Sequence, residues 1–235
     1  MVRTILVTGS NQGLGMHTVH QLGSTPDVLV FMGSRKLAAA EEALSKFAAD
    51  IHSSSTVVPV QLDITDASSI KAVHAFVSDF LNERGIPGLD VLVNNAAIFV
   101  PSFQETYTVN VFGTVAITEA FRPLLSKGGA ILNISSGLGS MASYPKRPKP
   151  RPLLPAYASS KAALNMLTVQ WAMQEEEKGS GIRVVSICPG FNATNLNNYA
   201  GTMSPADGCK VIVKAALEKE GRTGVFFNKD GDNQW

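Results

Sequence analysis

Short apolar runs rich in β-branched residues alternate with longer helix-forming segments along the whole chain of 235 residues. The runs that we predict to be strands are Arg3–Thr8, Val28–Met32, Thr56–Gln61, Leu89–Val93, Ala130–Ile134, Arg183–Ile187 and Gly224–Phe227. The main segments with helical character are Leu37–Ala49, Ser68–Asn82, Thr108–Leu125, Ala156–Glu177 and Pro205–Glu220. Such alternation requires crossover connections between parallel strands. It predicts one α/β domain over residues 1–235, a doubly wound (Rossmann-type), mostly parallel, seven-stranded sheet with helices on both faces.

The composition disfavours several classes of protein. Twenty Lys and Arg against 19 Asp and Glu leave a net charge of +1, so no chain-wide field would attract nucleic acid or a membrane surface. No run approaches the roughly 20 apolar residues of a membrane span, and the N-terminus lacks the pattern of a secretory leader. The two cysteines, Cys188 and Cys209, form neither a disulfide framework nor a metal motif. We therefore expect a cytoplasmic protein without a metal, nucleic-acid or membrane partner.

A glycine-rich turn follows the first predicted strand. Residues 8–15 read TGSNQGLG and lead into an apolar helix start, with the spacing GxxxGxG. Glycines allow a tight turn and a close approach of backbone to a pyrophosphate, and the helix N-terminus offers free N–H groups. We predict that Gly9, Asn11, Gln12, Gly13, Leu14 and Gly15 bind a dinucleotide. The alternative is a glycine-rich turn that binds no ligand.

The end of the second predicted strand indicates which dinucleotide binds. An NAD site places Asp or Glu there to accept a hydrogen bond from the adenosine ribose. This chain instead has Ser34, Arg35 and Lys36, with no carboxylate before Glu41. A guanidinium can grip a 2′-phosphate with two hydrogen bonds, and the Ser34 hydroxyl can add a third. We therefore predict NADP(H) as the cofactor, the alternative being that Arg35 and Lys36 are solvated loop cations.

Tyr157 and Lys161 stand four residues apart in a predicted helix, so both side chains project from the same face. A nearby cation favours the phenolate, which predicts a lowered Tyr157 pKa and a usable general acid or base. The pair alone is common in amphipathic helices. Ser136 ends a predicted strand upstream, and ligands bind at strand carboxyl ends in doubly wound sheets.

Several motifs occur together in a fixed order. They are the turn at 8–15, Asn94-Asn95-Ala96-Ala97, Asn110, Ser136, Tyr157 with Lys161, and Pro189-Gly190. In this order the chain resembles the short-chain dehydrogenase/reductase family over nearly its whole length. Gly224-Val225-Phe226-Phe227, the final Gln234-Trp235 and Ser204-Pro205 are similar to the carbonyl reductase branch.

The resemblance implies four catalytic residues. Tyr157 would donate a proton to the substrate carbonyl oxygen, and Ser136, rather than Ser135, would hydrogen-bond that oxygen. Lys161 would lower the Tyr157 pKa and bind the nicotinamide ribose. Asn110 would hold a water that connects Lys161 to solvent.

The resemblance also implies further cofactor contacts. Asp63 would contact adenine, Asn94 and Ala96 the adenosine ribose, and Pro189, Gly190 and Thr194 the nicotinamide and phosphates, with Tyr157 and Lys161 completing the set. For Asp63, Asn94, Ala96, Pro189, Gly190 and Thr194, the alternative is a purely structural role. Ala97 stands where the family usually has Gly, which requires a negative φ there.

The distance from Ser136 to Tyr157 is 21 positions, about eight more than is common in the family. The added residues include the segment 144–152, which holds four prolines and four cations and must bulge beside the mouth of the site. Three interpretations remain open: a solvated connection, a rim whose cations favour an anionic or oxygen-rich substrate, or a docking strip for an SH3-like or acidic partner. The short segment between Gly190 and Pro205 suggests an open pocket. The sequence leaves open whether the chain is a monomer or a homo-oligomer.

The expected function is NADPH-dependent reduction of a ketone or aldehyde, with a small-molecule carbonyl substrate. One alternative is an NADP-dependent alcohol dehydrogenase that runs the same chemistry in the oxidative direction. Another is a cofactor-binding regulator without catalysis, which the presence of Asn110, Ser136, Tyr157 and Lys161 disfavours.

Overall fold

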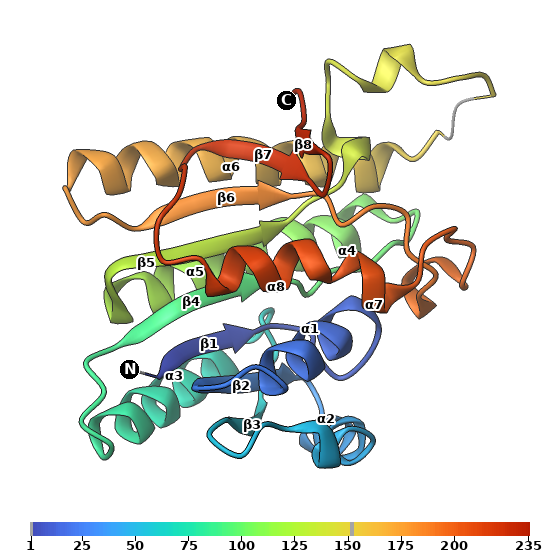
Figure 1. Ribbon diagram of the computed structural model, residues 1–235. Coiled ribbons are helices and arrows are strands. Elements are labelled where there is room, and N and C mark those ends of the chain that lie inside the picture. Colours follow the sequence, from blue (N-terminus) through green and yellow to red (C-terminus); the bar gives the residue numbers. More distant parts are fainter. Residues whose placement is uncertain (1, 151–152) are drawn as a thin grey trace.

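The fold is that of a computed structural model, which describes residues 2–150 and 153–235. Arg151 and Pro152, which end the predicted Pro/Lys/Arg segment, lie outside the described residues. One sheet runs in the order β3-β2-β1-β4-β5-β6-β7-β8 (Figure 1). Its strands are β1 (Arg3–Val7), β2 (Val28–Ser34), β3 (Thr56–Gln61), β4 (Leu89–Asn94), β5 (Leu125–Ile134), β6 (Arg183–Ile187), β7 (Val225–Asn228) and β8 (Gly231–Asp232).

The strand order reverses between β1 and β4, which are neighbours in the sheet although β2 and β3 lie between them in sequence. All pairs are parallel except β7 with β8. A reversal of this kind opens a crevice at the carboxyl ends of the strands, where doubly wound proteins bind ligands. The predicted α/β, doubly wound, mostly parallel fold is confirmed.

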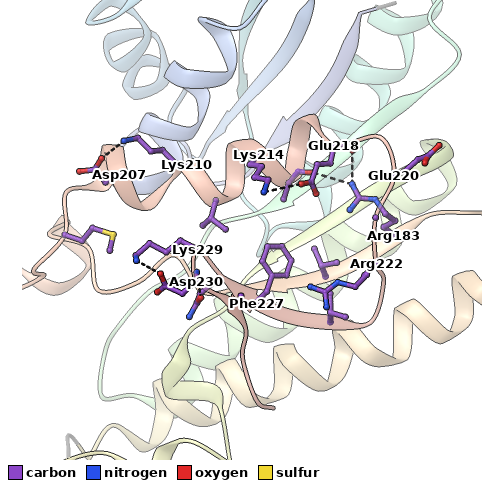
Figure 2. A pocket seen from close by; sticks show the side chains of 18 residues that line it. Arg183, Asp207, Lys210, Lys214, Glu218, Glu220, Arg222, Phe227, Lys229 and Asp230 are labelled. Atoms are coloured by element: carbon purple, nitrogen blue, oxygen red, sulfur yellow. Dashed lines mark hydrogen bonds and ion pairs between the residues drawn. The ribbon is translucent and has the colours of Figure 1, made fainter.

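The predicted count of seven strands is corrected to eight. The added strand, β8, has two residues that pair antiparallel with Phe227 and Asn228. Two residues without an apolar pattern carry no strand signal in the sequence. A cavity of about 990 Å³ lies between this hairpin and α8 (Lys210–Leu217) (Figure 2).

The charged side chains around this cavity largely form ion pairs with one another. Lys210 contacts Asp207 at 2.6 Å, and Lys229 contacts Asp230 at 2.6 Å. Figure 2 shows these ion pairs on the cavity rim. Five cations and four carboxylates line this cavity, so its charge is close to balanced, and none of the predicted site residues lies there.

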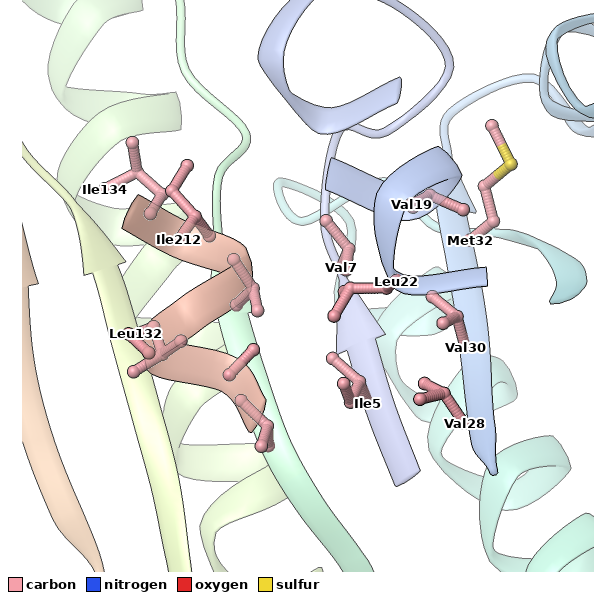
Figure 3. Close-up of a cluster of buried hydrophobic side chains, with 14 of the residues drawn as sticks. Ile5, Val7, Val19, Leu22, Val28, Val30, Met32, Leu132, Ile134 and Ile212 are labelled. Atoms are coloured by element: carbon pink, nitrogen blue, oxygen red, sulfur yellow. The ribbon is translucent and has the colours of Figure 1, made fainter. Parts of the chain in front are cut away.

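Helices cover both faces of the sheet. α1 (Gly13–Gly23), α2 (Leu37–Ser45) and α8 pack on one face, and α3 (Ala67–Asn82), α5 (Thr114–Phe121) and α6 (Pro155–Glu177) on the other. Because successive strand residues point to opposite faces, Ile5 and Val7 join the first layer and Leu6 the second. Figure 3 shows α1 and α8 of the first layer over β1, β2 and β5. The short helices α4 (Phe103–Tyr107) and α7 (Pro205–Gly208) lie near the carboxyl ends of the strands.

Three predicted helices end early or are interrupted. The segment Leu37–Ala49 ends as α2 at Ser45 and is followed by a 3₁₀ turn, Ala48–Asp50. The segment Thr108–Leu125 begins as a π-helical turn, Thr108–Gly113, before α5, and ends in a 3₁₀ turn. Gly113 allows close packing there, because a Cβ would lie 3.0 Å from the Ile64 carbonyl oxygen. The segment Pro205–Glu220 divides at Cys209 into α7 and α8. Among the described residues, no helix is both long and apolar enough to cross a membrane.

Candidate active site

A cavity of about 1210 Å³ lies along the carboxyl ends of the parallel strands. Predicted site residues from both halves of the sheet line it: Gly9, Asn11, Gln12, Gly13, Leu14, Gly15, Ser34, Arg35, Asp63, Ala96, Ser136, Tyr157, Lys161, Pro189, Gly190 and Thr194. Asn94 and Asn110 are the two predicted residues that are not part of the lining. The fold thus brings together positions up to 185 residues apart, from Gly9 to Thr194, in one crevice.

The glycine turn is built for close approach at two positions. Gly9 has φ +60°, and a Cβ there would lie 2.8 Å from the Ala96 Cα. At Gly15 a Cβ would lie 2.5 Å from the carbonyl oxygen of Gly9. The turn runs directly into α1, whose N-cap residue Gln12 makes no side-chain capping bond. The first N–H groups of α1 are therefore available to an anionic group in the cavity.

Asn95 holds this turn in place, and the sequence analysis did not single it out. Its amide nitrogen donates hydrogen bonds of 2.9 Å to the carbonyl oxygens of Thr8 and of Gly9. The predicted neighbour, Asn94, is instead buried and donates 2.8 Å bonds to Thr118 and Asn133. Side chains alternate in direction at the end of β4, which places Asn95 on the cavity wall and Asn94 inside the sheet.

The far end of the cavity holds the residues that follow β2 and β3. Arg35 is exposed, and within the described part of the chain no ion pair involves it. Ser34 is buried beside it. The Asp63 carboxylate accepts hydrogen bonds from the backbone N–H and hydroxyl of Thr65, at 2.9 and 2.7 Å. This end therefore offers a guanidinium with no carboxylate paired to it.

The other end of the cavity holds Ser136, Tyr157 and Lys161. The Ser136 hydroxyl accepts a 3.1 Å bond from the N–H of Leu138, and Ser136 lies near enough to the Tyr157 phenol to lower its pKa. Ser135 is turned away, because its hydroxyl donates a 2.6 Å bond to Asn165. The Phe99 ring meets the Tyr157 ring edge to face, with 5.0 Å between centroids.

Burial is the largest influence on the pKa values of Tyr157 and Lys161. It raises the pKa of Tyr157 well above its usual range, the nearby Cys188 sulfur raises it further, and Ser136 only partly offsets this. Burial also lowers the pKa of Lys161 to about 8. The prediction that Lys161 lowers the Tyr157 pKa toward working pH is therefore wrong for this structure. The cost of removing a phenolate from water exceeds what a desolvated amine can offset.

Lys161 is 3% exposed, and its ammonium donates a 2.8 Å hydrogen bond to the carbonyl oxygen of Ile134. This bond fixes the side chain at the end of β5. Cys188 was also missed by the sequence analysis, although it precedes the Pro189-Gly190 motif. Its sulfur accepts a 3.2 Å bond from the N–H of Gly137, next to Ser136.

Asn110 lies in the π-helical turn and is 1% exposed. Its amide oxygen accepts a 2.8 Å bond from the N–H of Ile98, and its nitrogen donates to the Ile98 carbonyl and to Ser160 on α6. These bonds tie the chain before Phe99 to the helix that carries Tyr157. The water that Asn110 is expected to hold remains a prediction.

The sequence matches the family profile of the short chain dehydrogenases over residues 3–205. The chain belongs to the short-chain dehydrogenase family. The short-chain dehydrogenase anuI of Penicillium roqueforti is 35% identical over 247 residues, which cover 98% of this chain and 94% of that protein. Carbonyl reductase [NADPH] 1 of Macaca fascicularis is 28% identical over 281 residues, covering 100% and 99%.

Solved structures agree with this family assignment. The NADPH-bound carbonyl reductase from chicken fatty liver superposes with a TM-score of 0.80 at 30% identity, covering 100% of this chain and 99% of that chain. The carbonyl reductase Sniffer of D. melanogaster gives a TM-score of 0.83 at 26% identity, covering both chains completely, 100% each. The predicted likeness of this short-chain dehydrogenase to the carbonyl reductase branch is confirmed.

Proposed function

We propose that this short-chain dehydrogenase reduces a ketone or aldehyde to an alcohol with NADPH as the hydride source. The observation that carries the proposal is that Ser136, Tyr157 and Lys161 line the same cavity as the glycine turn and Arg35. Further support comes from the NADPH-bound carbonyl reductase that this chain resembles in structure.

The residues present fit an NADP(H) molecule. The turn at Gly9 and Gly15 leaves no room for side chains, so backbone N–H groups can approach a pyrophosphate. At the far end the exposed Arg35 guanidinium suits a 2′-phosphate, whereas a ribose 2′-hydroxyl would call for a carboxylate. Gln12, Gly13, Thr194 and Asn95 would hold or shape the phosphate site, and Lys161 would hold the nicotinamide ribose.

When bound, NADPH supplies the hydride. Tyr157 and Ser136 line the same cavity, and each would donate a hydrogen bond to the carbonyl oxygen of a substrate. The raised pKa of Tyr157 keeps its phenol protonated at neutral pH, so it can act as a general acid. Oxidation of an alcohol would need the phenolate as the base.

After Tyr157 donates its proton, the phenolate must be reprotonated before the next turnover. Lys161, with a pKa of about 8, is the more acidic of the two groups and can pass a proton to the phenolate. Asn110, which lies against Ser160 one residue before Lys161, is placed to position α6 for this step. The electrostatic stabilisation of the developing alkoxide falls to the Ser136 and Tyr157 hydroxyls.

The test is consumption of NADPH in the presence of a panel of aryl ketones, quinones and aldehydes, with the alcohol product identified by mass spectrometry. The proposal expects stoichiometric alcohol formation with NADPH and much slower turnover with NADH. Absence of alcohol product from every carbonyl compound in the panel would contradict the proposed function.

We also propose that residues 1–235 form a single dinucleotide-binding and catalytic domain located in the cytoplasm. All eight strands belong to one sheet, which supports a single cooperative unit. Cys188 and Cys209 are free thiols, which suits a reducing compartment. A single calorimetric unfolding transition and fractionation of a tagged chain would test the two proposals separately.

A further inference from the structure

The cavity has an unequal charge distribution at its catalytic end. Among the described residues, five charged side chains line the cavity: Arg35, Lys36, Asp63, Arg147 and Lys161. Four are cations, and the one carboxylate, Asp63, follows β3 at the far end and binds Thr65. The catalytic end therefore holds two cations, Lys161 and Arg147. Lys161 donates to the Ile134 carbonyl and is assigned to the cofactor ribose and to Tyr157, so Arg147 is the cation at this end to which no role in cofactor binding or proton transfer is assigned.

Arg147 comes from the added segment between Ser136 and Tyr157, yet it reaches the turn that carries the catalytic serine. Its Nη2 lies 3.1 Å from the place that a Cβ on Gly137 would occupy. Gly137 follows Ser136 directly, and its N–H donates to Cys188. A side chain at position 137 would press against the guanidinium. The glycine thus leaves the space that Arg147 uses beside Ser136.

Contacts with the C-terminus hold this segment in place. The Ser140 hydroxyl donates a 2.7 Å bond to the carbonyl oxygen of Gln234, and the Ala142 N–H donates a 2.9 Å bond to that of Trp235. Lys146 donates a 3.3 Å bond to the Gln234 side chain. A 3₁₀ turn, Tyr144–Lys146, then leads into Arg147, whose guanidinium lies 5.7 Å from the Tyr144 ring centre. Arg147 therefore extends from an anchored loop.

Several apolar side chains line the cavity together with this cation. Phe99 packs on Tyr157, and Leu138, Leu154 and Phe191 also line the cavity. Leu138 follows the serine turn and Leu154 precedes α6, so both lie close to Ser136 and Tyr157 in the chain. Apolar side chains and one guanidinium in the same cavity suit a ligand with an apolar body and a single anionic group, because an ion pair strengthens as water is excluded.

We propose that Arg147 is a specificity-determining residue that selects carbonyl substrates with an apolar body and an anionic oxygen. This inference rests on the proposed function. The anionic oxygen can belong to a carboxylate or to the ionised hydroxyl of an acidic phenol, since a guanidinium recognises both. Of the interpretations that the sequence left open for this segment, the position of Arg147 supports a substrate rim.

The test uses matched pairs of substrates that differ only in charge. One pair is an aryl keto acid and its methyl ester, and the other is an acidic acyl phenol and its methyl ether. The quantity measured is the ratio of kcat/KM for the anion to that for its neutral partner. It is determined for the wild type, Arg147→Gln, Arg147→Lys and the control Lys149→Gln, which removes an exposed cation from the same loop.

The wild type should favour the anion in at least one pair by about 10-fold or more, chiefly through KM. Arg147→Gln should abolish that preference while changing kcat/KM for the neutral partner by less than about twofold. Arg147→Lys should restore part of the preference, because it keeps the charge without the two-pronged geometry. Lys149→Gln should retain it. A response of the acid pair alone or of the phenol pair alone identifies the source of the anion, and either result supports the inference.

A binding measurement separates failure of this inference from failure of the proposed function. Isothermal titration of the same four compounds into the NADPH-loaded protein gives affinities without turnover. If no compound is reduced but Arg147→Gln weakens only the anions, the proposed function fails and the anion site stands. If the ratio of anion to neutral partner is the same in wild type and Arg147→Gln for both pairs, in binding and turnover, the inference is overturned.

Discussion

The ammonium nitrogen of Lys161 lies 5.6 Å from the centre of the Tyr157 ring, one helical turn further along α6. Both groups have lost most of their contact with water, and burial moves their pKa values in opposite directions. The phenol becomes the weaker acid and the ammonium the stronger one. The pair is therefore arranged for Tyr157 to act in its protonated form and for Lys161 to return the proton.

This arrangement predicts a descending pH profile for carbonyl reduction. Lys161 is protonated below its pKa of about 8 and neutral above it. The rate at which it reprotonates Tyr157 should therefore fall as pH rises. We expect kcat to be nearly constant below that pH and to fall by up to about tenfold per pH unit above it. Steady-state rates between mildly acidic and alkaline pH provide the measurement, and a rate that stays constant far above the Lys161 pKa would exclude this role.

Arg35 should determine the choice between the two nicotinamide cofactors. Arg35→Ala removes a charged hydrogen-bond donor worth about 1.5–3 kcal/mol, so NADPH binding should weaken roughly 10–100-fold. NADH binding should change little, because NADH has no 2′-phosphate. Fluorescence titration of both cofactors tests this, with Lys71→Ala, an exposed cation on α3, as the control. An equal loss of affinity for NADPH and NADH would argue against a 2′-phosphate contact.

A buried ion pair under α6 should control stability rather than catalysis. Arg122 and Glu175 are 8% and 3% exposed, and both the Nε and Nη2 atoms of Arg122 donate to Glu175 Oε1. Glu175→Gln would leave the Arg122 charge paired with the exposed carboxylate of Glu119 alone, at 2.9 Å, which should lower the free energy of unfolding by about 1.5–3 kcal/mol. Glu176→Gln, on the exposed side of the same helix, should change it little. Chemical denaturation of the two variants measures the difference.

The same pair predicts acid sensitivity. Burial opposes ionisation of Glu175, but hydrogen bonds from Arg122, Ser180 and Lys178 outweigh it, so its pKa is lowered from the usual 4.5. A lowered folded-state pKa contributes stability that is present above pH 4.5 and is lost as pH falls through the folded value. In Glu175→Gln this component of the acid-induced loss should disappear. An unchanged pH dependence in that variant would show that other groups control it.

The sheet and the glycine turn were predictable because their signals are local. Apolar β-branched runs mark the strands, and a strand followed by closely spaced glycines marks the turn. The eighth strand escaped prediction because two residues such as Gly231 and Asp232 carry no periodicity and pair only through the hairpin after β7. Gly208, directly before the break at Cys209, packs closely against Asn192, a contact between residues distant in sequence that the local pattern does not reveal.

Some site residues were likewise predictable from local sequence signals, and others depend on the fold. Ser136, Tyr157 and Lys161 were predictable from spacing and from a family resemblance, and the structure brings them together in one cavity. Asn95 and Asn94 have identical side chains, so only the pleat of β4 decides which of them lines the cavity. The pKa of Tyr157 depends on how deeply the phenol is buried, which the spacing between Tyr157 and Lys161 cannot reveal.

The most direct measurement is the rate of NADPH oxidation with a reducible ketone by the wild type and by Tyr157→Phe, with NADPH affinity measured in parallel. The phenylalanine keeps the ring against Phe99 and removes only the acidic hydroxyl. We predict a fall in kcat of about 10²–10⁴-fold with nearly unchanged NADPH affinity. Equal rates of ketone-dependent NADPH oxidation in the two proteins would contradict the assignment of Tyr157 as the proton donor.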